Sequence, residues 1–161
     1  MRKSLLFKPT RSKGISKMDL GAVEKAYAVD GVDISGDDGS LWTPDDLLKD
    51  MERSELSVTL VRQGTLSLPV AYSVFRPAGR TVWIRKIGVD RFHRLRGIGR
   101  NLYQTILEQA RIGGDARCVR VFVPAMALNA QKFFRACGMV AIRQLDEYEL
   151  DGKYLFEKEI R

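Results

Sequence analysis

Residues 89–100 read Val89-Asp90-Arg91-Phe92-His93-Arg94-Leu95-Arg96-Gly97-Ile98-Gly99-Arg100 and contain the most informative local pattern of the chain. It predicts the end of a strand, a basic loop, and a helix that begins on two glycines. Glycines let the backbone come close to a bulky anion, and the free N–H groups of a first helical turn point at it. The helix dipole adds a favourable potential, and guanidinium groups pair with phosphate oxygens. The local chemistry therefore predicts a cradle for a pyrophosphate.

A Gly-x-Gly pattern alone is a weak signal, because a turn followed by a helix start produces the same pattern. A Walker-type phosphate loop is excluded, since no Gly-Lys-Ser/Thr follows. The dinucleotide-binding fingerprint is incomplete, and its strand should open the fold instead of following three antiparallel strands. The rest of the chain has to decide between these meanings.

Outward from this stretch, the spacing of apolar residues predicts a mixed α/β fold. We expect a mostly antiparallel twisted sheet of about seven strands, flanked by about four helices. The expected strands cover residues 4–11, 56–61, 68–75, 81–89, 118–123, 139–150 and 153–160, and the expected helices cover residues 18–29, 43–53, 97–112 and 129–137.

Turn and cap signals join these elements. Thr43, followed by a proline, predicts a helix N-cap, and Pro77-Ala78-Gly79 predicts a turn. Asp151-Gly152 predicts a two-residue hairpin. The strand–helix–strand order of the C-terminal half implies at least one parallel pairing. Because no linker or repeat interrupts the pattern, we expect a single domain over residues 1–161.

Composition narrows the class of protein. The chain has 161 residues, of which 45% are hydrophobic, as in an ordinary globular protein. No apolar run is long enough to span a membrane or to form a signal-peptide core, which favours a cytoplasmic location. Cys118 and Cys137 suit reduced core thiols, and a single histidine leaves little basis for a metal site.

The net charge of +7 is unevenly distributed. Residues 1–17 carry six basic and no acidic side chains, and residues 57–135 carry fourteen basic and three acidic ones. Residues 30–56 carry nine acidic and two basic side chains. One part of the protein should therefore attract anions and another part cations.

Two motifs make the chain resemble the GNAT superfamily of N-acetyltransferases over essentially its whole length. The segment Arg94-Leu95-Arg96-Gly97-Ile98-Gly99 matches the signature Gln/Arg-x-x-Gly-x-Gly/Ala. The segment Phe133-Phe134-Arg135-Ala136-Cys137-Gly138-Met139 is similar to the second hallmark, aromatic-aromatic-x-x-x-Gly-aromatic, with Met139 replacing the last aromatic. The chain also loosely resembles the protein N-terminal alanine acetyltransferases of the ribosomal-protein type.

The resemblance implies acetyl transfer from acetyl-CoA, as a cosubstrate, to a primary amine. The backbone of the strand before the signature would pair with the pantetheine arm, and the N–H groups of residues 95–100 would hold the pyrophosphate. A backbone N–H near the thioester would stabilise the developing oxyanion. The cofactor-binding residues implied in this way are Ile87, Gly88, Val89, Arg94, Leu95, Arg96, Gly97, Ile98, Gly99, Arg100, Asn129 and Phe134.

The chain departs from the family at positions that carry chemistry. Phe134 stands where family members often have a proton-donating tyrosine, and it is either a pantetheine contact or a plain core aromatic. Phe122 replaces the glutamate base of the ribosomal-protein enzymes, and Ala127 replaces their cofactor-contacting asparagine. Asn129 is either a cofactor contact or the cap of its helix. No catalytic acid or base is therefore assigned, and we expect direct attack of a neutral amine on the thioester.

The acidic segments would form the acceptor groove of such a fold. Residues 30–55 and the acids of residues 146–151, with Trp42 and Tyr148 as candidate walls, favour a cationic acceptor such as a basic peptide or a polyamine. The alternative is that these acids only keep the surface soluble. Two competing functions are a non-catalytic acetyl-CoA-binding regulatory module and a basic protein that binds RNA or the ribosome. A homodimer is left open.

Overall fold

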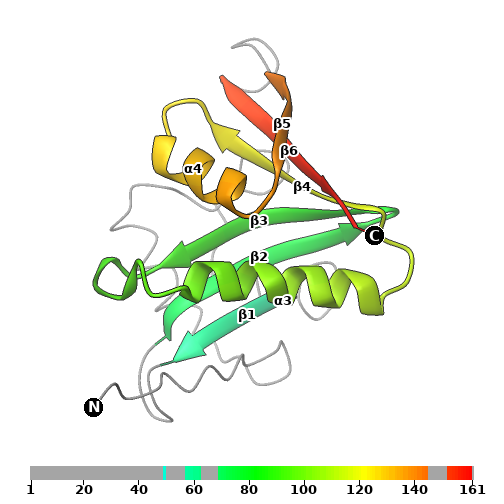
Figure 1. Cartoon of the computed structure of the whole chain (residues 1–161). Coiled ribbons are helices and arrows are strands. Elements are labelled where there is room, and N and C mark those ends of the chain that lie inside the picture. Colours follow the sequence, from blue (N-terminus) through cyan, green and yellow to red (C-terminus); the bar gives the residue numbers. More distant parts are fainter. Residues whose placement is uncertain (1–48, 50–56, 63–68, 145–151, 161) are drawn as a thin grey trace. The chain divides into compact units, whose positions relative to one another are not determined.

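The computed structural model describes residues 49, 57–62, 69–144 and 152–160. Within these residues it has one sheet with the strand order β1-β2-β3-β4-β6-β5, accompanied by helices (Figure 1). The described elements are β1 (Ser57–Arg62), β2 (Pro69–Ala78), β3 (Thr81–Val89), the short 3-10 helix η2 (Arg91–His93), α3 (Ile98–Ile112), β4 (Cys118–Pro124), α4 (Leu128–Ala136), β5 (Val140–Gln144) and β6 (Lys153–Glu159).

The expected strand 4–11, the expected helix 18–29 and the cap at Thr43 lie outside the described residues. Of the helix expected at 43–53, only Lys49 is described, and it is helical. The mixed α/β class is confirmed, and the described part contains six strands. The chain divides into two compact units: unit 1 comprises residues 1–75 and 86–102, and unit 2 comprises residues 76–85 and 103–161. Strands β2 and β3 and helix α3 each contribute to both units.

Unit 1 is built on the antiparallel pair of β1 and β2. Val58 lies opposite Val74 and Leu60 opposite Tyr72, with a register shift near Arg62. The first residues of α3 pack on these strands, as apolar residues at helical spacing predict. The buried cluster consists of Val61, Ala71, Ile98 and Leu102, and Val70, Ile87 and Val89 pack against it. The core of unit 1 thus lies under the start of α3.

Unit 2 contains the parallel pairing that the strand–helix–strand order implied. The start of β3 pairs with β4 from Thr81 opposite Cys118 to Ile84 opposite Val121. Strand β6 pairs antiparallel with both β4 and β5. Helix α4 follows β4 and leads into β5 (Figure 1).

Three local expectations in unit 2 need correction. Strand β2 continues to Ala78, and Gly79, at φ 58°, begins the turn, because proline suits extended backbone whereas glycine tolerates positive φ. The nearly continuous apolar run of residues 118–123 predicts a strand of the fully buried kind, whereas β4 buries only alternate residues. The register of β5 on β6 does not fit the two-residue hairpin expected at residues 151 and 152. Gln144 lies opposite Tyr154, whereas an uninterrupted hairpin with that turn would place Gln144 opposite Glu159.

Gly88 is required by the residue that covers it. A Cβ atom at this position would lie 2.3 Å from the hydroxyl oxygen and the Cζ atom of Tyr72. Tyr72 is buried on the neighbouring strand, and its rigid ring has little room to move away. A glycine at this position of β3 therefore lets the ring of Tyr72 lie directly against the backbone.

We expect Gly88→Ala to lower the free energy of unfolding by about 1–3 kcal/mol, because the added methyl group overpacks a filled site. Urea denaturation followed by circular dichroism would measure the change. Gly113→Ala is the matched control, since its Cβ would meet only backbone oxygens at 3.7 Å. Equal effects of the two substitutions would contradict this account of Gly88.

Tyr103 of α3 carries a buried hydroxyl group that has no hydrogen-bond partner in the described part of unit 2. Burial raises the pKa of this phenol well above its usual range, because the charged form would lose its hydration. The Lys158 ammonium lies 5.9 Å from the centre of the ring and donates a hydrogen bond to the Cys137 carbonyl at 3.1 Å. The cation therefore contacts the ring of Tyr103 and not its hydroxyl group.

Tyr103→Phe should raise the free energy of unfolding by about 1 kcal/mol, because it removes an unsatisfied polar atom and keeps the ring. Thermal and urea unfolding of the two proteins would measure the difference. Loss of stability would show that the hydroxyl group has a partner after all.

Candidate cofactor site

The basic loop of unit 1 begins where β3 leaves the sheet. The Asp90 N–H donates to the Val70 carbonyl at 2.8 Å. The chain then makes one turn of 3-10 helix at η2, closed by the His93 N–H on the Asp90 carbonyl at 2.8 Å. Two backbone hydrogen bonds thus fix the direction in which the loop departs.

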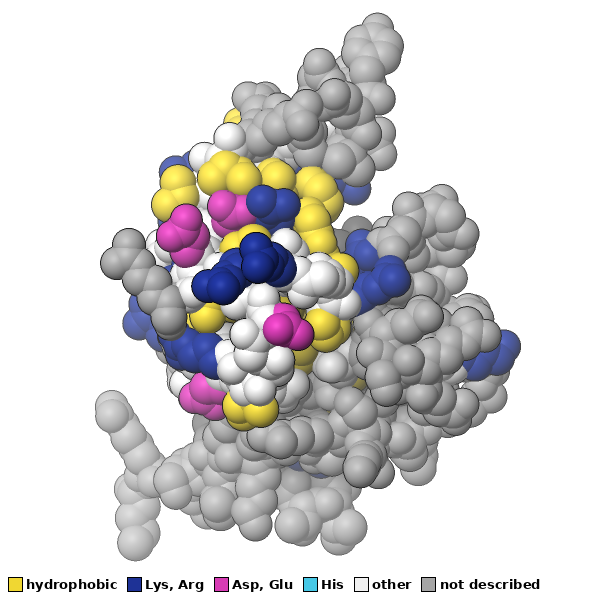
Figure 2. Space-filling view, turned by 90° about the vertical axis from the view of Figure 1, so that its right-hand side faces the viewer, with side chains coloured by type: hydrophobic (Ala, Val, Ile, Leu, Met, Phe, Trp, Pro, Cys, Tyr) yellow, Lys and Arg dark blue, Asp and Glu magenta, His cyan; other side chains and the backbone are white. Residues whose placement is uncertain are grey.

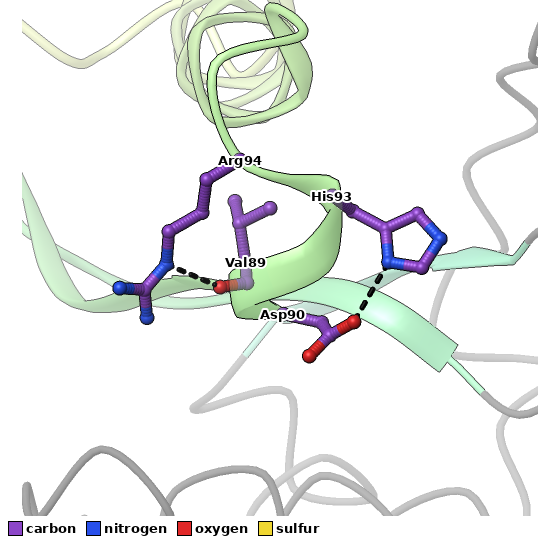
Figure 3. A network of polar contacts seen from close by, with 4 residues as sticks. All are labelled: Val89, Asp90, His93 and Arg94. Atoms are coloured by element: carbon purple, nitrogen blue, oxygen red, sulfur yellow. Dashed lines mark hydrogen bonds and ion pairs between the residues drawn. The ribbon is translucent and has the colours of Figure 1, made fainter.

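Side chains brace the same turn (Figure 3). The Nδ1 atom of His93 lies 2.7 Å from Oδ2 of Asp90, whose carboxylate accepts the hydrogen bond. The Arg94 Nε–H donates to the Val89 carbonyl at 2.9 Å. In Figure 3 the side chains of His93 and Arg94 leave the turn in opposite directions, so the turn is held on both sides. The spacing Asp90-x-x-His93 is the signal for this contact in the sequence.

The backbone reverses twice before α3 begins. Leu95 has φ 60° and Gly97 has φ 81°, both in the left-handed region. The first helical hydrogen bond runs from the Asn101 N–H to the Gly97 carbonyl at 3.0 Å. The N–H groups of Ile98 and Gly99 come before this bond, so the helix itself provides no acceptor for them. Donors in this position suit an anion at the helix N-terminus.

The charge of the loop fits the same ligand. The guanidinium groups of Arg91, Arg94, Arg96 and Arg100 belong to exposed side chains, and the first turn of α3 contains no acidic residue. In the view of Figure 2, by contrast, basic and acidic side chains are interspersed with apolar ones. The backbone donors and the positive charge of this loop suit a phosphate-bearing anion such as a pyrophosphate.

Comparison with known proteins shows the family. The model of the acetyltransferase (GNAT) family matches residues 33–139. The chain belongs to this family. It is therefore a GNAT acetyltransferase, and enzymes of this family use acetyl-CoA as the acetyl donor. No protein of curated function matches the sequence at a significant level.

Solved structures share the fold of this acetyltransferase. The YncA protein of Salmonella typhimurium, solved with acetyl-CoA, aligns with a TM-score of 0.73 and 16% identity over 96% of this chain and 94% of its own. The spermidine/spermine N-acetyltransferase SpeG of Vibrio cholerae aligns with a TM-score of 0.72 and 12% identity over 95% of this chain and 93% of its own. The ribosomal-protein-S18-alanine N-acetyltransferase of Escherichia coli aligns with a TM-score of 0.68 and 14% identity over 95% of this chain and 94% of its own. At these identities the likeness shows the fold alone.

Most of the predicted cofactor residues of the acetyltransferase lie in one continuous segment of unit 1. Residues 87–89 form the end of β3, residues 94–97 form the loop, and residues 98–100 begin α3. Asn129 and Phe134 belong to unit 2. Asn129 is exposed and is the second residue of α4, which has Ala127 at its N-cap. The expectation that Asn129 caps its helix is therefore wrong, because the helix begins one residue earlier than the sequence pattern indicated.

Both phenylalanines at the divergent positions pack against other rings of unit 2. Phe134 is buried, lies edge-on to Phe133 at 5.1 Å between ring centres, and lies 6.5 Å from Phe156. Phe122 is half-buried and stacks on Trp83 at 5.2 Å. Neither ring can donate or accept a proton, so these two positions supply no acid or base.

The described part of the acetyltransferase contains neither a cluster of metal-binding side chains nor a membrane-spanning helix. Among residues 49, 57–62, 69–144 and 152–160, no three acidic, histidine or cysteine side chains could hold a metal ion together. No helix within those same ranges has the length and apolar character to cross a membrane.

Leu95→Gly should raise the free energy of unfolding by about 1 kcal/mol, because an L side chain at positive φ is strained and glycine is not. The Leu95 side chain is fully exposed, so little packing is lost. Gly97→Ala should have the opposite effect, since it places a Cβ atom at φ 81°. Urea denaturation of both variants measures the pair, and a stability loss from Leu95→Gly would contradict the strain.

Proposed function

We propose that this acetyltransferase is a single domain over residues 1–161 that transfers the acetyl group of acetyl-CoA to a primary amine. The observation that supports the proposal is the loop of unit 1. There, two backbone reversals precede the N–H groups at the start of α3, and the same segment carries four exposed arginines.

Different residues of unit 1 would bind different parts of acetyl-CoA. The N–H groups of Ile98 and Gly99 would face the pyrophosphate, with Gly97 giving the backbone its close approach. The exposed guanidinium of Arg96 would add charge-assisted hydrogen bonds. The backbone of residues 87–89 would pair with the pantetheine arm, as the family resemblance implies. Bound acetyl-CoA supplies a thioester carbonyl that a neutral amine can attack, releasing the thiol.

The acceptor is proposed from charge and from the class of relatives. The structural relatives include enzymes named for spermidine and spermine and for the alanine of a ribosomal protein, all of which offer amines. The acidic side chains in question belong to residues 30–48, 50–56 and 146–151, which lie outside the described residues. Their charge supports a cationic acceptor, such as a basic peptide or a polyamine, in the cytoplasm.

A non-catalytic acetyl-CoA-binding module is the second candidate. It is favoured by Phe122 and Phe134, which place aromatic packing at the positions where the family resemblance implies a base and an acid, respectively. Direct attack by a neutral amine needs neither group, because thiolate is a good leaving group and proximity supplies much of the rate. Turnover with any amine therefore separates the two candidates.

The deciding experiment measures release of free thiol from acetyl-CoA over a panel of acceptors. The panel contains basic peptides with free or blocked N-termini, spermidine, an aminoglycoside and an acidic peptide. We expect release with the cationic acceptors only. Binding of acetyl-CoA without release from any acceptor would favour the non-catalytic module.

Arg96→Glu should weaken acetyl-CoA binding at least about tenfold, because a charge-assisted contact is replaced by repulsion. Arg111→Glu, at the other end of α3, makes the same change in net charge and should leave binding nearly unchanged. Isothermal titration calorimetry at low and high salt would measure both, and the difference should shrink at high salt. Equal losses would mean that only the total charge matters.

A further inference from the structure

Phe92 is an aromatic residue left open to solvent beside the proposed cofactor loop. Its side chain is 69% exposed. It is the middle residue of η2, five positions before Gly97. An exposed ring on a braced turn is unusual, because aromatic side chains contribute most when their faces are covered. The ring therefore has surface available for a ligand.

The turn holds Phe92 in place. Asp90 contacts His93 through both backbone and side chain, and the Asp90 N–H is tied to β2. The Arg91 guanidinium lies 4.5 Å from the centre of the Phe92 ring. This cation–π contact orients the ring and places a positive charge at its face, while more than half of the side chain stays in solvent.

We propose that Phe92 is a stacking platform for the adenine ring of acetyl-CoA. The inference rests on the proposed function, since it takes the pyrophosphate to lie at the start of α3. Coenzyme A carries its adenine one ribose away from the pyrophosphate, and that ribose bears a further phosphate. A flat aromatic face beside a guanidinium matches this combination of a base and a phosphate.

The match is local to one loop. Phe92 and Arg91 lie in the same segment as Arg96 and the Ile98 and Gly99 N–H groups, and a single ligand with both phosphates and a base would use them together. An exposed aromatic beside arginines is also a feature of proteins that lie on anionic membranes. Adenine is favoured here because the same loop provides oriented backbone donors, which a membrane surface does not require.

The test separates the adenosine end of the ligand from the thioester end. Binding of acetyl-CoA, of acetyl-phosphopantetheine, which lacks adenosine, and of adenosine bisphosphate is measured by isothermal titration calorimetry. Phe92→Ala should weaken binding of acetyl-CoA and adenosine bisphosphate about tenfold and leave binding of acetyl-phosphopantetheine unchanged. Phe92→Trp should retain affinity, and its fluorescence should be quenched by adenosine bisphosphate.

Ile112→Ala is the matched control, because Ile112 is an apolar residue with 78% exposure at the far end of α3. It should change none of the three affinities. If Phe92→Ala leaves all three affinities unchanged, or weakens acetyl-CoA and acetyl-phosphopantetheine equally, the platform is overturned. Loss of binding to phosphatidylserine vesicles with unchanged acetyl-CoA affinity would overturn it in favour of a membrane contact. If the wild-type protein binds no acetyl-CoA, the proposed function fails first.

Discussion

The hydrogen bond from the Asp90 N–H to the Val70 carbonyl marks the point where β3 leaves the sheet and the cofactor loop begins. This hydrogen bond sets the direction in which the loop after β3 leaves the sheet. The turn of η2 closes on the Asp90 carbonyl, and the Asp90 carboxylate holds His93. Because these contacts fix the turn before any ligand arrives, the backbone donors ahead of α3 need little reordering to meet an anion.

The backbone of the loop is strained where it turns toward the N–H groups at the start of α3. Leu95 adopts a positive φ that glycine would adopt without strain, and Gly97 reverses the backbone a second time. Strain of this kind persists where the surrounding structure over-determines it, and it is commonest at binding sites. The contacts of Asp90, His93 and Arg94 on one side and the buried Ile98 on the other provide that constraint.

The two phenylalanines of unit 2 that replace the acid and the base of the family pattern pack against other aromatic rings. Phe134 is part of an aromatic cluster with Phe133 and Phe156, and Phe122 stacks on Trp83. On the same sheet, Arg120 pairs with Glu157, and the carboxylate raises the pKa of the guanidinium. A charged pair of this kind is already satisfied, so it adds no free base. The family fold is therefore retained, while the acid–base chemistry is not carried by these phenylalanines.

The local elements and their order can be predicted from the sequence alone. The strand that ends at Val89, the loop of arginines and the helix starting near Gly97 follow from turn, cap and charge preferences, which act over a few residues. Tertiary structure decided the contacts between distant residues. The ring of Tyr72 against Gly88, the register of β5 on β6 and the burial of Phe134 depend on which surfaces meet. The start of α4 at Leu128 was also missed, because an alanine N-cap carries no side-chain signal. Periodicity shows that a residue has an apolar neighbour, but only packing decides which neighbour it is.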